Sequence, residues 1–366
     1  MTDQVAQVAV VGAGWWSGIV HLPAVVAHPG AELVAVCDAD PERARTAAEM
    51  FGARRWTTNV EELPGMGVDC AVVATPHDAH QEPVGYLLDA GVDVLVEKPM
   101  TIHPRDAWDL VERATRSGAR LHVGYPFLHS VQAGALRRLV RESGIGDPVL
   151  LDALLATAVE GFYRGDFSSQ QASGAPFASR SATYSFTKRG GGQLLTQVTH
   201  AVALALWCLE DPVERVLGLS TGGGRSEVDD VDVVSARMDR GTLLAVSSTG
   251  TVHKNDARTE RYTLFGTAGH ALLDTVTSSL VVARPGRADE TLATAADGPA
   301  NAVRAPLAAL VATRLFDAPV IVDGALGARV VEVLWAARTS AASGRAVRPT
   351  DWAQDPAADD TRTGAR

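Results

Sequence analysis

Cysteine is scarce in this chain of 366 residues, which holds only Cys37, Cys70 and Cys208. The three are far apart and odd in number, so they fit neither a disulfide framework nor the spacing of metal ligands. A free cysteine usually behaves as a small buried apolar side chain. We therefore predict three core thiols in a reducing compartment, and no metal site.

An excess of basic residues is also missing. Lysine and arginine together number 33 against 43 acidic residues, which gives a formal net charge of −10. A chain with this balance repels phosphate backbones and anionic lipid surfaces. We expect neither a nucleic acid nor a membrane among its partners.

Signals for export or membrane insertion are lacking too. The first residues, MTDQVAQVAVVGAG, carry an acid and no basic cluster, and they lead directly into a predicted strand. We therefore expect no signal peptide. We also expect no uncharged run that approaches the length needed to span a bilayer. Together these expectations predict a cytoplasmic protein.

Apolar residues are plentiful. The chain is 46% hydrophobic and 21% charged, which allows a full core and excludes wholesale disorder. The length points to two domains or one large one.

A strand, a glycine turn and a helix open the chain. Val5–Val11 is a predicted strand, and a helical stretch reaches about Ala27 after the turn GAGWWSG. Gly12 allows a tight turn and Gly14 lets the backbone approach a pyrophosphate, which would lie at the helix N-terminus. Ser17 stands where the dinucleotide fingerprint usually has its third glycine, so a plain turn is the alternative.

The next predicted strand, Ala31–Cys37, ends at Asp38, about 20 residues past the turn, where an acid binds the adenosine ribose in such folds. The charge of Asp38 disfavours a 2′-phosphate and so predicts NAD, while Arg43 keeps NADP open as the alternative cofactor. The other interpretation makes Asp38 the N-cap of a helix over Pro41–Phe51.

A third predicted strand, Asp69–Ala74, leads into Thr75-Pro76-His77-Asp78-Ala79-His80. These small and turn-forming residues would let the chain pass under a cofactor, and His80 would open a helix over Gln81–Ala90. Taken alone, either histidine is better explained as a capping or surface residue.

Val92–Val96 is an apolar strand that ends in Glu97-Lys98-Pro99. Ligands bind outside the carboxyl ends of strands in open α/β sheets, so this charged pair lies where a site is expected. A surface ion pair is the alternative. A helix over His103–Ser117 and a strand over Arg120–Gly124 complete an alternation that predicts a doubly wound parallel sheet.

The second half shows consecutive strand signals separated by turns. They predict a mostly antiparallel, meander-like sheet of seven strands, Pro148–Val159, Arg215–Ser220, Asp232–Met238, Leu243–Thr251, Tyr262–Gly266, Gly269–Asp274 and Leu280–Arg284. A helix over Val131–Glu142 leads into this half. The long polar loop Glu160–Lys188 is expected to roof a substrate pocket.

A glycine triplet, Gly190–Gly192, precedes the helical stretch QLLTQVTHAVALALWCL. The triplet permits close approach of the backbone to a ligand. Thr196 and His200 are four residues apart and share one face of that helix. A hydrogen-bonded core histidine is the alternative interpretation of His200.

Taken in order, VVGAGWW, VCDAD, VVATPHDAH, VEKPM, GGGQLLTQVTH and the stretch Pro319–Val347 resemble the Gfo/Idh/MocA oxidoreductases. The resemblance implies an α/β protein with a Rossmann NAD(P)-binding domain at residues 1–125. It further implies a C-terminal α+β domain with a mostly antiparallel sheet at 126–350, and a polar tail at 351–366.

The resemblance also implies roles for single residues. Lys98 and His200 are the predicted catalytic pair, and Thr196 stands where the family commonly has an aspartate. The predicted cofactor-binding residues are Gly12, Gly14, Trp15, Trp16, Asp38, Thr75, Pro76, His80, Glu97 and Lys98. The predicted substrate-binding residues are Tyr125, Arg164, Tyr184, Lys188 and Thr196.

The implied activity is hydride transfer between NAD(P) and a secondary alcohol carbon of a sugar, inositol or glycoside. His200 would move the proton while Lys98, held by Glu97 or the cofactor ribose, orients the oxygen; the exchange of these roles is the alternative. Two other functions stay open: a glycosidase that uses NAD transiently, and a non-catalytic NAD-dependent sensor. The resemblance also implies a homodimer or homotetramer, because a second subunit is the family's usual cover for the open face of the sheet.

Overall fold

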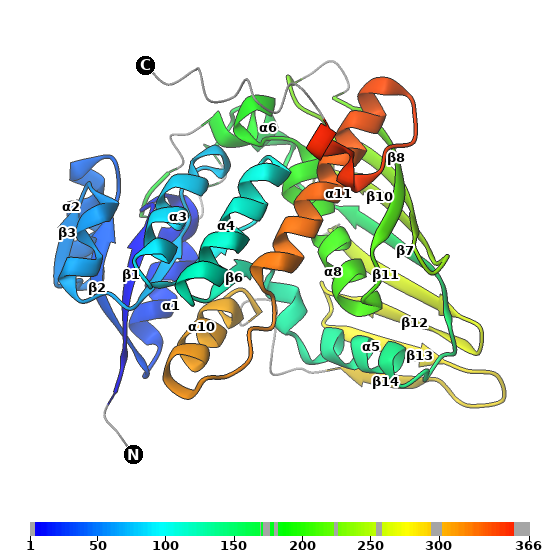
Figure 1. Ribbon diagram of the computed structural model, residues 1–366. Coiled ribbons are helices and arrows are strands. Elements are labelled where there is room, and N and C mark those ends of the chain that lie inside the picture. The colour runs from blue at the N-terminus through cyan, green and yellow to red at the C-terminus, as the bar shows by residue number, and fades with distance from the viewer. Residues whose placement is uncertain are drawn as a thin grey trace.

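The computed structural model describes residues 4–168, 170, 176–178, 182–222, 226–253, 258–293 and 302–354. It contains a six-stranded sheet and an eight-stranded sheet, each with helices against it (Figure 1). Most of the predicted tail, from residue 355 onward, and residues 169, 171–175 and 179–181 of the predicted roof loop lie outside the described residues.

The six-stranded sheet is parallel throughout and has the order β3-β2-β1-β4-β5-β6. The predicted doubly wound sheet is therefore confirmed. The sequence did not reveal β3, which is three residues long with two of them exposed. The strands are β1 (Ala6–Val11), β2 (Ala31–Cys37), β3 (Arg55–Thr57), β4 (Cys70–Val73), β5 (Asp93–Glu97) and β6 (Leu121–Gly124).

Helices cover both faces of this sheet, which explains why its strands read as continuous apolar runs. In β1, Val8 and Val10 face the core cluster beneath α1, α2 and α10, whereas Ala9 and Val11 face the cluster beneath α3 and α4. The helices are α1 (Leu22–Ala27), α2 (Pro41–Phe51), α3 (Gln81–Asp89), α4 (Pro104–Ser117) and α10 (Ala305–Phe316). A helix from late in the chain thus completes one face of the first sheet.

Asp40 caps α2. Its carboxylate accepts hydrogen bonds from the backbone N–H groups of Glu42 and Arg43. This corrects the alternative interpretation of Asp38 as that cap and leaves the Asp38 carboxylate for another use. Gly52 ends the helix in the left-handed conformation at φ 72°.

The eight-stranded sheet has the order β14-β13-β12-β11-β7-β10-β9-β8. Its pairs are antiparallel except that β7 runs parallel to β10. The mostly antiparallel sheet is confirmed, but a single meander is wrong, because the first strand lies between two meanders. The strands are β7 (Pro148–Ala156), β8 (Val213–Thr221), β9 (Val231–Met238), β10 (Leu243–Thr249), β11 (Thr259–Gly266), β12 (Gly269–Asp274), β13 (Ser279–Ala283) and β14 (Glu290–Ala293).

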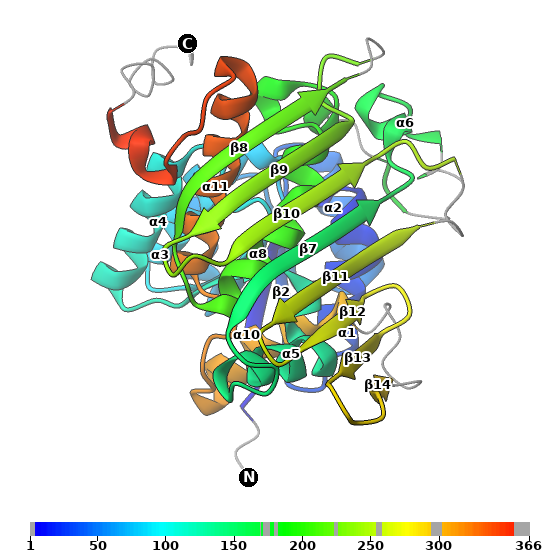
Figure 2. The ribbon, with the colours of Figure 1, turned by 90° about the vertical axis from the view of Figure 1, so that its right-hand side faces the viewer.

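The two faces of this sheet differ in cover. Its inner face packs against α5 (Val131–Arg141), α8 (Thr199–Leu209) and α11 (Gly324–Ser343). Figure 2 shows the outer face turned to the viewer, with these helices behind it. Large apolar side chains are exposed on its strands: Val149, Leu154, Leu217, Leu219, Val233, Leu243 and Phe265.

One helical stretch of the described residues, Thr187–Leu209, is long and apolar enough to cross a membrane. The expectation that no uncharged run approaches that length was therefore wrong. Of its most apolar window, however, 89% is buried inside the protein. Its α8 portion packs against α5 and α11, and α11 in turn contacts α4 of the first half (Figure 1). The stretch serves as the core helix of the second half.

Candidate functional site

A groove of about 540 Å³ runs along the carboxyl edge of the parallel sheet. Gly12 adopts φ 91° there, and a Cβ on it would lie 2.7 Å from the Ala74 carbonyl oxygen, so this turn requires glycine. A Cβ on Gly14 would meet no atom of the described residues within 4 Å. Gly14 lines the groove, so the glycine turn leaves room where a ligand would approach the backbone.

Ser17 replaces the third glycine of the fingerprint without opening the turn. Its buried hydroxyl donates a hydrogen bond to the Gly12 carbonyl oxygen. Ser17–His21 forms a π-helical turn before α1. Such turns occur often at functional sites, because they let a helix widen around one residue.

Asp38 lines the same groove, at the end of β2. Its two carboxylate oxygens accept hydrogen bonds from the backbone N–H groups of Ala13 (2.7 Å) and Asp40 (2.9 Å). A carboxylate offers about four acceptor positions, so it can also bind a pair of hydroxyl groups. Arg43, Thr75 and Pro76 line the groove as well.

His80 does not line the groove; it is fully buried beneath it. Its Nδ1 lies 3.1 Å from the Pro99 carbonyl oxygen and its Nε2 lies 3.0 Å from that of Thr75. The ring therefore joins the loops after β4 and β5. This corrects its predicted role from a cofactor contact to a residue that positions the groove wall.

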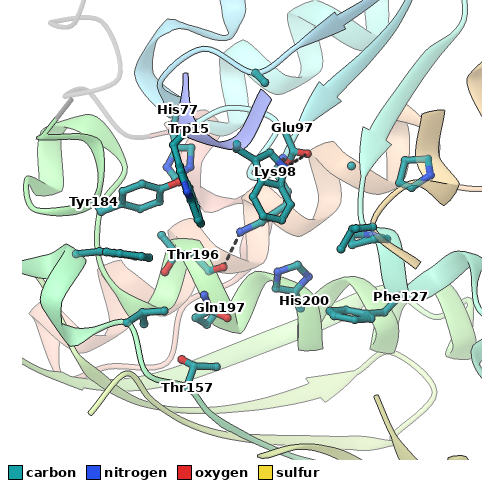
Figure 3. Close-up of a pocket in the computed structure, with 18 of the residues that line it drawn as sticks. Trp15, His77, Glu97, Lys98, Phe127, Thr157, Tyr184, Thr196, Gln197 and His200 are labelled. Atoms are coloured by element: carbon teal, nitrogen blue, oxygen red, sulfur yellow. Dashed lines mark hydrogen bonds between the residues drawn. The ribbon is translucent and has the colours of Figure 1, made fainter. Parts of the chain in front are cut away.

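A second cavity, of about 310 Å³, adjoins the groove. Lys98, from the end of β5, and His200, from α8, both line it, although they are 102 residues apart in the sequence (Figure 3). The Lys98 Nζ donates a hydrogen bond to the Thr196 carbonyl oxygen at 2.8 Å. The backbone of the second half thus holds the amine, a partner that the expectation of Glu97 or the cofactor ribose did not include.

Glu97 has partners of its own. Its Oε1 accepts a hydrogen bond from the Trp16 indole and lies 2.9 Å from the His21 Nε2. Burial favours the neutral acid, but the His21 hydrogen bond and charge, the Lys98 charge and the Trp16 hydrogen bond lower the pKa of Glu97 to about 2. Glu97 is therefore a fixed negative charge in the wall of the cavity.

The pKa values of both candidate catalytic groups are lowered. Burial lowers the pKa of Lys98, although Glu97 and Glu260 oppose that shift. Burial, with the charges of Lys98 and Arg258, lowers the pKa of His200 well below its ordinary value. His200 is thus an uncharged imidazole at neutral pH, and the Lys98 ammonium group loses its proton more readily than that of an exposed lysine.

Tyr125 lies behind His200 and does not line the larger cavity. Its ring is buried and meets the His200 ring edge-on, and its hydroxyl lies 2.7 Å from the Thr199 hydroxyl. The predicted substrate contact is therefore corrected to a residue that positions His200. Phe127 also meets His200 edge-on and does line the cavity.

Thr196 lines the cavity, but other residues engage its hydroxyl. The hydroxyl donates to the Gly192 carbonyl oxygen and lies 2.6 Å from the hydroxyl of Tyr163. Thr196 belongs to a second π-helical turn, Leu194–Val198. Thr196 contributes to the site mainly through its backbone carbonyl oxygen, which accepts the hydrogen bond from Lys98.

Of the substrate contacts predicted in the roof loop, the structure brings one to the cavity and two elsewhere. Tyr184 lines both the groove and the cavity. Arg164 forms an ion pair with Glu160, outside the cavity lining, and Lys188 is exposed. The structure therefore does not bring these two residues to the cavity, and a polar loop sequence does not reveal which of its side chains turn inward.

Several lining residues escaped the sequence analysis. His77, at the start of the turn after β4, lines both groove and cavity, and its Nδ1 lies 2.8 Å from the Gly190 carbonyl oxygen. Its place in the TPHDAH loop was the available signal. Gln197, within the GGGQLLTQVTH motif, also lines the cavity, as do Phe127, Thr157, Phe162 and Arg258, which no local pattern marks.

The parallel sheet, its glycine turn and the acid after β2 define a dinucleotide-binding oxidoreductase fold with a second cavity at its cofactor edge. Residues 6–125 match the model of the oxidoreductase family with the NAD-binding Rossmann fold, and residues 134–272 match the GFO/IDH/MocA C-terminal domain. The chain belongs to this family of oxidoreductases with an NAD-binding Rossmann fold.

Curated relatives include the dTDP-3,4-didehydro-2,6-dideoxy-alpha-D-glucose 3-reductase of Streptomyces antibioticus. The two chains are 30% identical over 69% of this chain and 70% of the reductase. A putative UDP-kanosamine synthase oxidoreductase subunit of Amycolatopsis mediterranei is 38% identical, but over only 37% of each chain. The match to that relative thus spans little more than a third of its length.

Solved structures share the fold over nearly the whole chain. An oxidoreductase domain protein from Kribbella flavida has a TM-score of 0.82 at 20% identity and covers 94% of this chain and 99% of its own. GenD2 from gentamicin A biosynthesis, in complex with NAD, has a TM-score of 0.77 at 24% identity, with coverages of 94% and 96%.

Proposed function

We propose that this protein transfers a hydride between NAD and a secondary alcohol carbon of a sugar, inositol or glycoside. The observation that carries the proposal is the convergence of Lys98 and His200 on a cavity that shares a wall with the groove. Six residues line both spaces: Trp15, Trp16, Ala74, Thr75, His77 and Tyr184. A cofactor in the groove would therefore end beside the two candidate catalytic groups.

The groove fits a dinucleotide. Gly12 and Gly14 leave its phosphate side open, and Asp38 offers acceptors for ribose hydroxyls. The negative charge of Asp38 repels a 2′-phosphate and favours NAD, whereas Arg43 is the lining residue that would favour NADP. Bound NAD supplies the hydride acceptor; the protein supplies placement and proton transfer.

Proton transfer is better assigned to Lys98 than to His200, which is the exchange of roles that the sequence left open. An acid or base works best when its pKa lies near the working pH. Burial brings the pKa of Lys98 down toward that range, but it takes the pKa of His200 well below. We infer that Lys98 takes the proton of the substrate hydroxyl and that neutral His200 orients the same oxygen.

The lining of the cavity suits a sugar ring. Aromatic side chains supply flat apolar faces, and Thr157, Gln197 and Arg258 supply polar groups. A pocket with an apolar lining and few polar groups fixes the orientation of a small ligand. The rings that line it are Trp15, Trp16, Phe127, Phe162, Tyr163 and Tyr184.

A substrate screen tests the proposal. Sugars, inositols and glycosides are incubated with NAD or NADP while NADH absorbance and aglycone release are followed. Net NADH that depends on both Lys98 and His200 supports the proposal, with Lys98→Ala and His200→Ala each reducing turnover. If both variants stay within a few-fold of the parent, the assignment fails. Aglycone release without net NADH would indicate the glycosidase, and NAD binding without turnover would indicate the sensor.

The outer face of the eight-stranded sheet is the proposed contact between subunits. Leu219 is 71% exposed and Leu217 is 52% exposed, two residues apart on the same face of the strand β8. Large exposed apolar patches commonly mark interaction sites. A homodimer or homotetramer in analytical ultracentrifugation, converted to monomer by Leu219→Arg, would support it. The cytoplasmic location stays a prediction.

A further inference from the structure

Arg258 stands apart from the other residues that line the cavity. It precedes β11, and its guanidinium forms an ion pair with Glu260 while it lines the same cavity as Lys98 and His200. The nearby Arg261, on β11 itself, pairs instead with Asp274 and does not line that cavity. Of these two arginines, only Arg258 presents its charge to the proposed substrate.

The Arg258–Glu260 pair is built like a fixed support. The Glu260 side chain is nearly fully buried, and its Oε2 accepts a hydrogen bond from the Thr275 hydroxyl at 2.8 Å. Its Oε1 accepts from Arg258 Nε at 2.9 Å and also from Nη2. One edge of the guanidinium is thereby held, and no hydrogen-bond partner of Nη1 occurs among the described residues. A guanidinium carries five N–H donors, so donors remain for a ligand.

The charges around the cavity point to the sign of that ligand. Lys98 and Arg258 are the two cationic side chains of the lining, and both influence the protonation of His200. Glu97 is the carboxylate of the lining, and its Oε1 is already engaged by the Trp16 indole and by the His21 ring. A held guanidinium with unused donors binds carboxylate or phosphate through charge-assisted, often two-pronged, hydrogen bonds.

We propose that Arg258 binds an anionic group of the substrate, so that the preferred substrates are sugars that carry a carboxylate or a phosphate. The inference rests on the proposed function, because it assigns the substrate class of the same cavity. Carboxylate and phosphate share this chemistry, and three substrate types would bring it: a hexuronate, a hexose phosphate, and a nucleoside-diphosphate hexose.

The test compares matched neutral and anionic sugars on the purified protein with NAD. Each of the three anionic types is set against its neutral hexose, and the initial rate of NADH formation gives KM and kcat. We expect kcat/KM at least tenfold higher for one anionic type. Arg258→Gln should raise KM for that sugar about 10- to 100-fold with little change in kcat, because a hydrogen bond to a charged group is lost. Arg261→Gln, the same change of charge on the same sheet, should leave KM unchanged.

A double variant guards against a folding defect. Arg258→Gln alone leaves Glu260 buried without its partner, which can destabilise the protein. Arg258→Gln with Glu260→Gln removes both charges and should retain the high KM. Equal kcat/KM for neutral and anionic sugars, or a KM insensitive to both variants, overturns the inference while leaving the proposed function intact. If no sugar of either charge yields NADH, the proposed function itself fails, and the inference fails with it.

Discussion

The groove and the cavity share a wall but are built differently. The groove is formed mainly by residues near strand ends of the first half of the chain, including Asp38, and the roof loop adds Thr183 and Tyr184. The cavity is formed by side chains from both halves, with Lys98 held by a carbonyl oxygen of the other half. Changes to the groove should therefore alter cofactor binding, and changes to the cavity should alter turnover.

The largest effect is expected at Lys98. Lys98→Arg keeps a positive charge, but a guanidinium does not give up its proton in proteins. If Lys98 transfers the proton, kcat should fall about 10²- to 10⁴-fold in this variant. In the parent, the rate of alcohol oxidation should rise with pH as the amine deprotonates, with an apparent pKa below the ordinary 10.5. A Lys98→Arg enzyme that retains most of its kcat would show that only the charge matters.

Gly14→Ala tests the groove without disturbing the fold. Gly14 is not in the left-handed region, and an added Cβ meets no atom of the described residues within 4 Å, so the melting temperature should not change. If the pyrophosphate lies against Gly14, the Kd of NADH, measured by fluorescence, should rise about tenfold or more from the steric conflict.

Gly65→Ala is the matched control for this change. It also adds a Cβ in open space outside the left-handed region, but it lies away from the groove. It should leave both the NADH Kd and the melting temperature unchanged. Unchanged NADH binding in the Gly14 variant would place the pyrophosphate elsewhere.

Asp38→Ser should change cofactor choice more than turnover. Loss of the carboxylate removes the repulsion of a 2′-phosphate, and the ratio of kcat/KM for NADP to that for NAD should rise about tenfold. Asp40→Ser is the control, because serine also caps helices and Asp40 does not line the groove. The same shift in both variants would mean that Asp38 acts through the loop and not through its charge.

The smallest effect concerns His77, which lines both spaces. Burial, with the charges of His80 and Lys98, lowers the pKa of His77 from 6.5 to about 3. Between these values the unfolded chain binds a proton that the folded one does not. The stabilising contribution is thus complete above pH 6.5 and is lost as the pH falls, by about 1.4 kcal/mol per pH unit. Urea unfolding of His77→Asn should show a flatter decline below pH 6.5, and the same substitution at the exposed His253 is the matched control.

Much of the groove could be predicted from local signals in the sequence. Gly12, Gly14, Asp38 and Thr75 lie within a few residues of predicted strand ends, and the carboxyl ends of parallel strands share one edge of the sheet. The strand β3 escaped because three residues with two exposed make no pattern. The position of β7 between two meanders depends on pairings across more than 80 residues, which strand signals do not encode.

The cavity was only partly predictable for the same reason. Lys98 and His200 stood out through their motifs, and the structure brings them to one cavity. Tyr125 was misjudged because a strand end does not show whether a ring faces the substrate or the back of a histidine. Arg258 was missed because its neighbourhood is supplied by Glu260 and Thr275, through contacts that exist only after folding.

The helix α10 has a consequence for how the protein is made. Its Leu307, Leu310 and Val311 complete the core on one face of the parallel sheet, beside Val8 and Val10 of the first strand. Since the ribosome delivers the amino-terminal residues first, that face stays without its last helix until nearly the whole polypeptide has emerged. Until α10 has been synthesised, this apolar surface of the nascent chain is exposed and can associate with other proteins. A fragment ending at residue 125 would expose it permanently and should aggregate on expression.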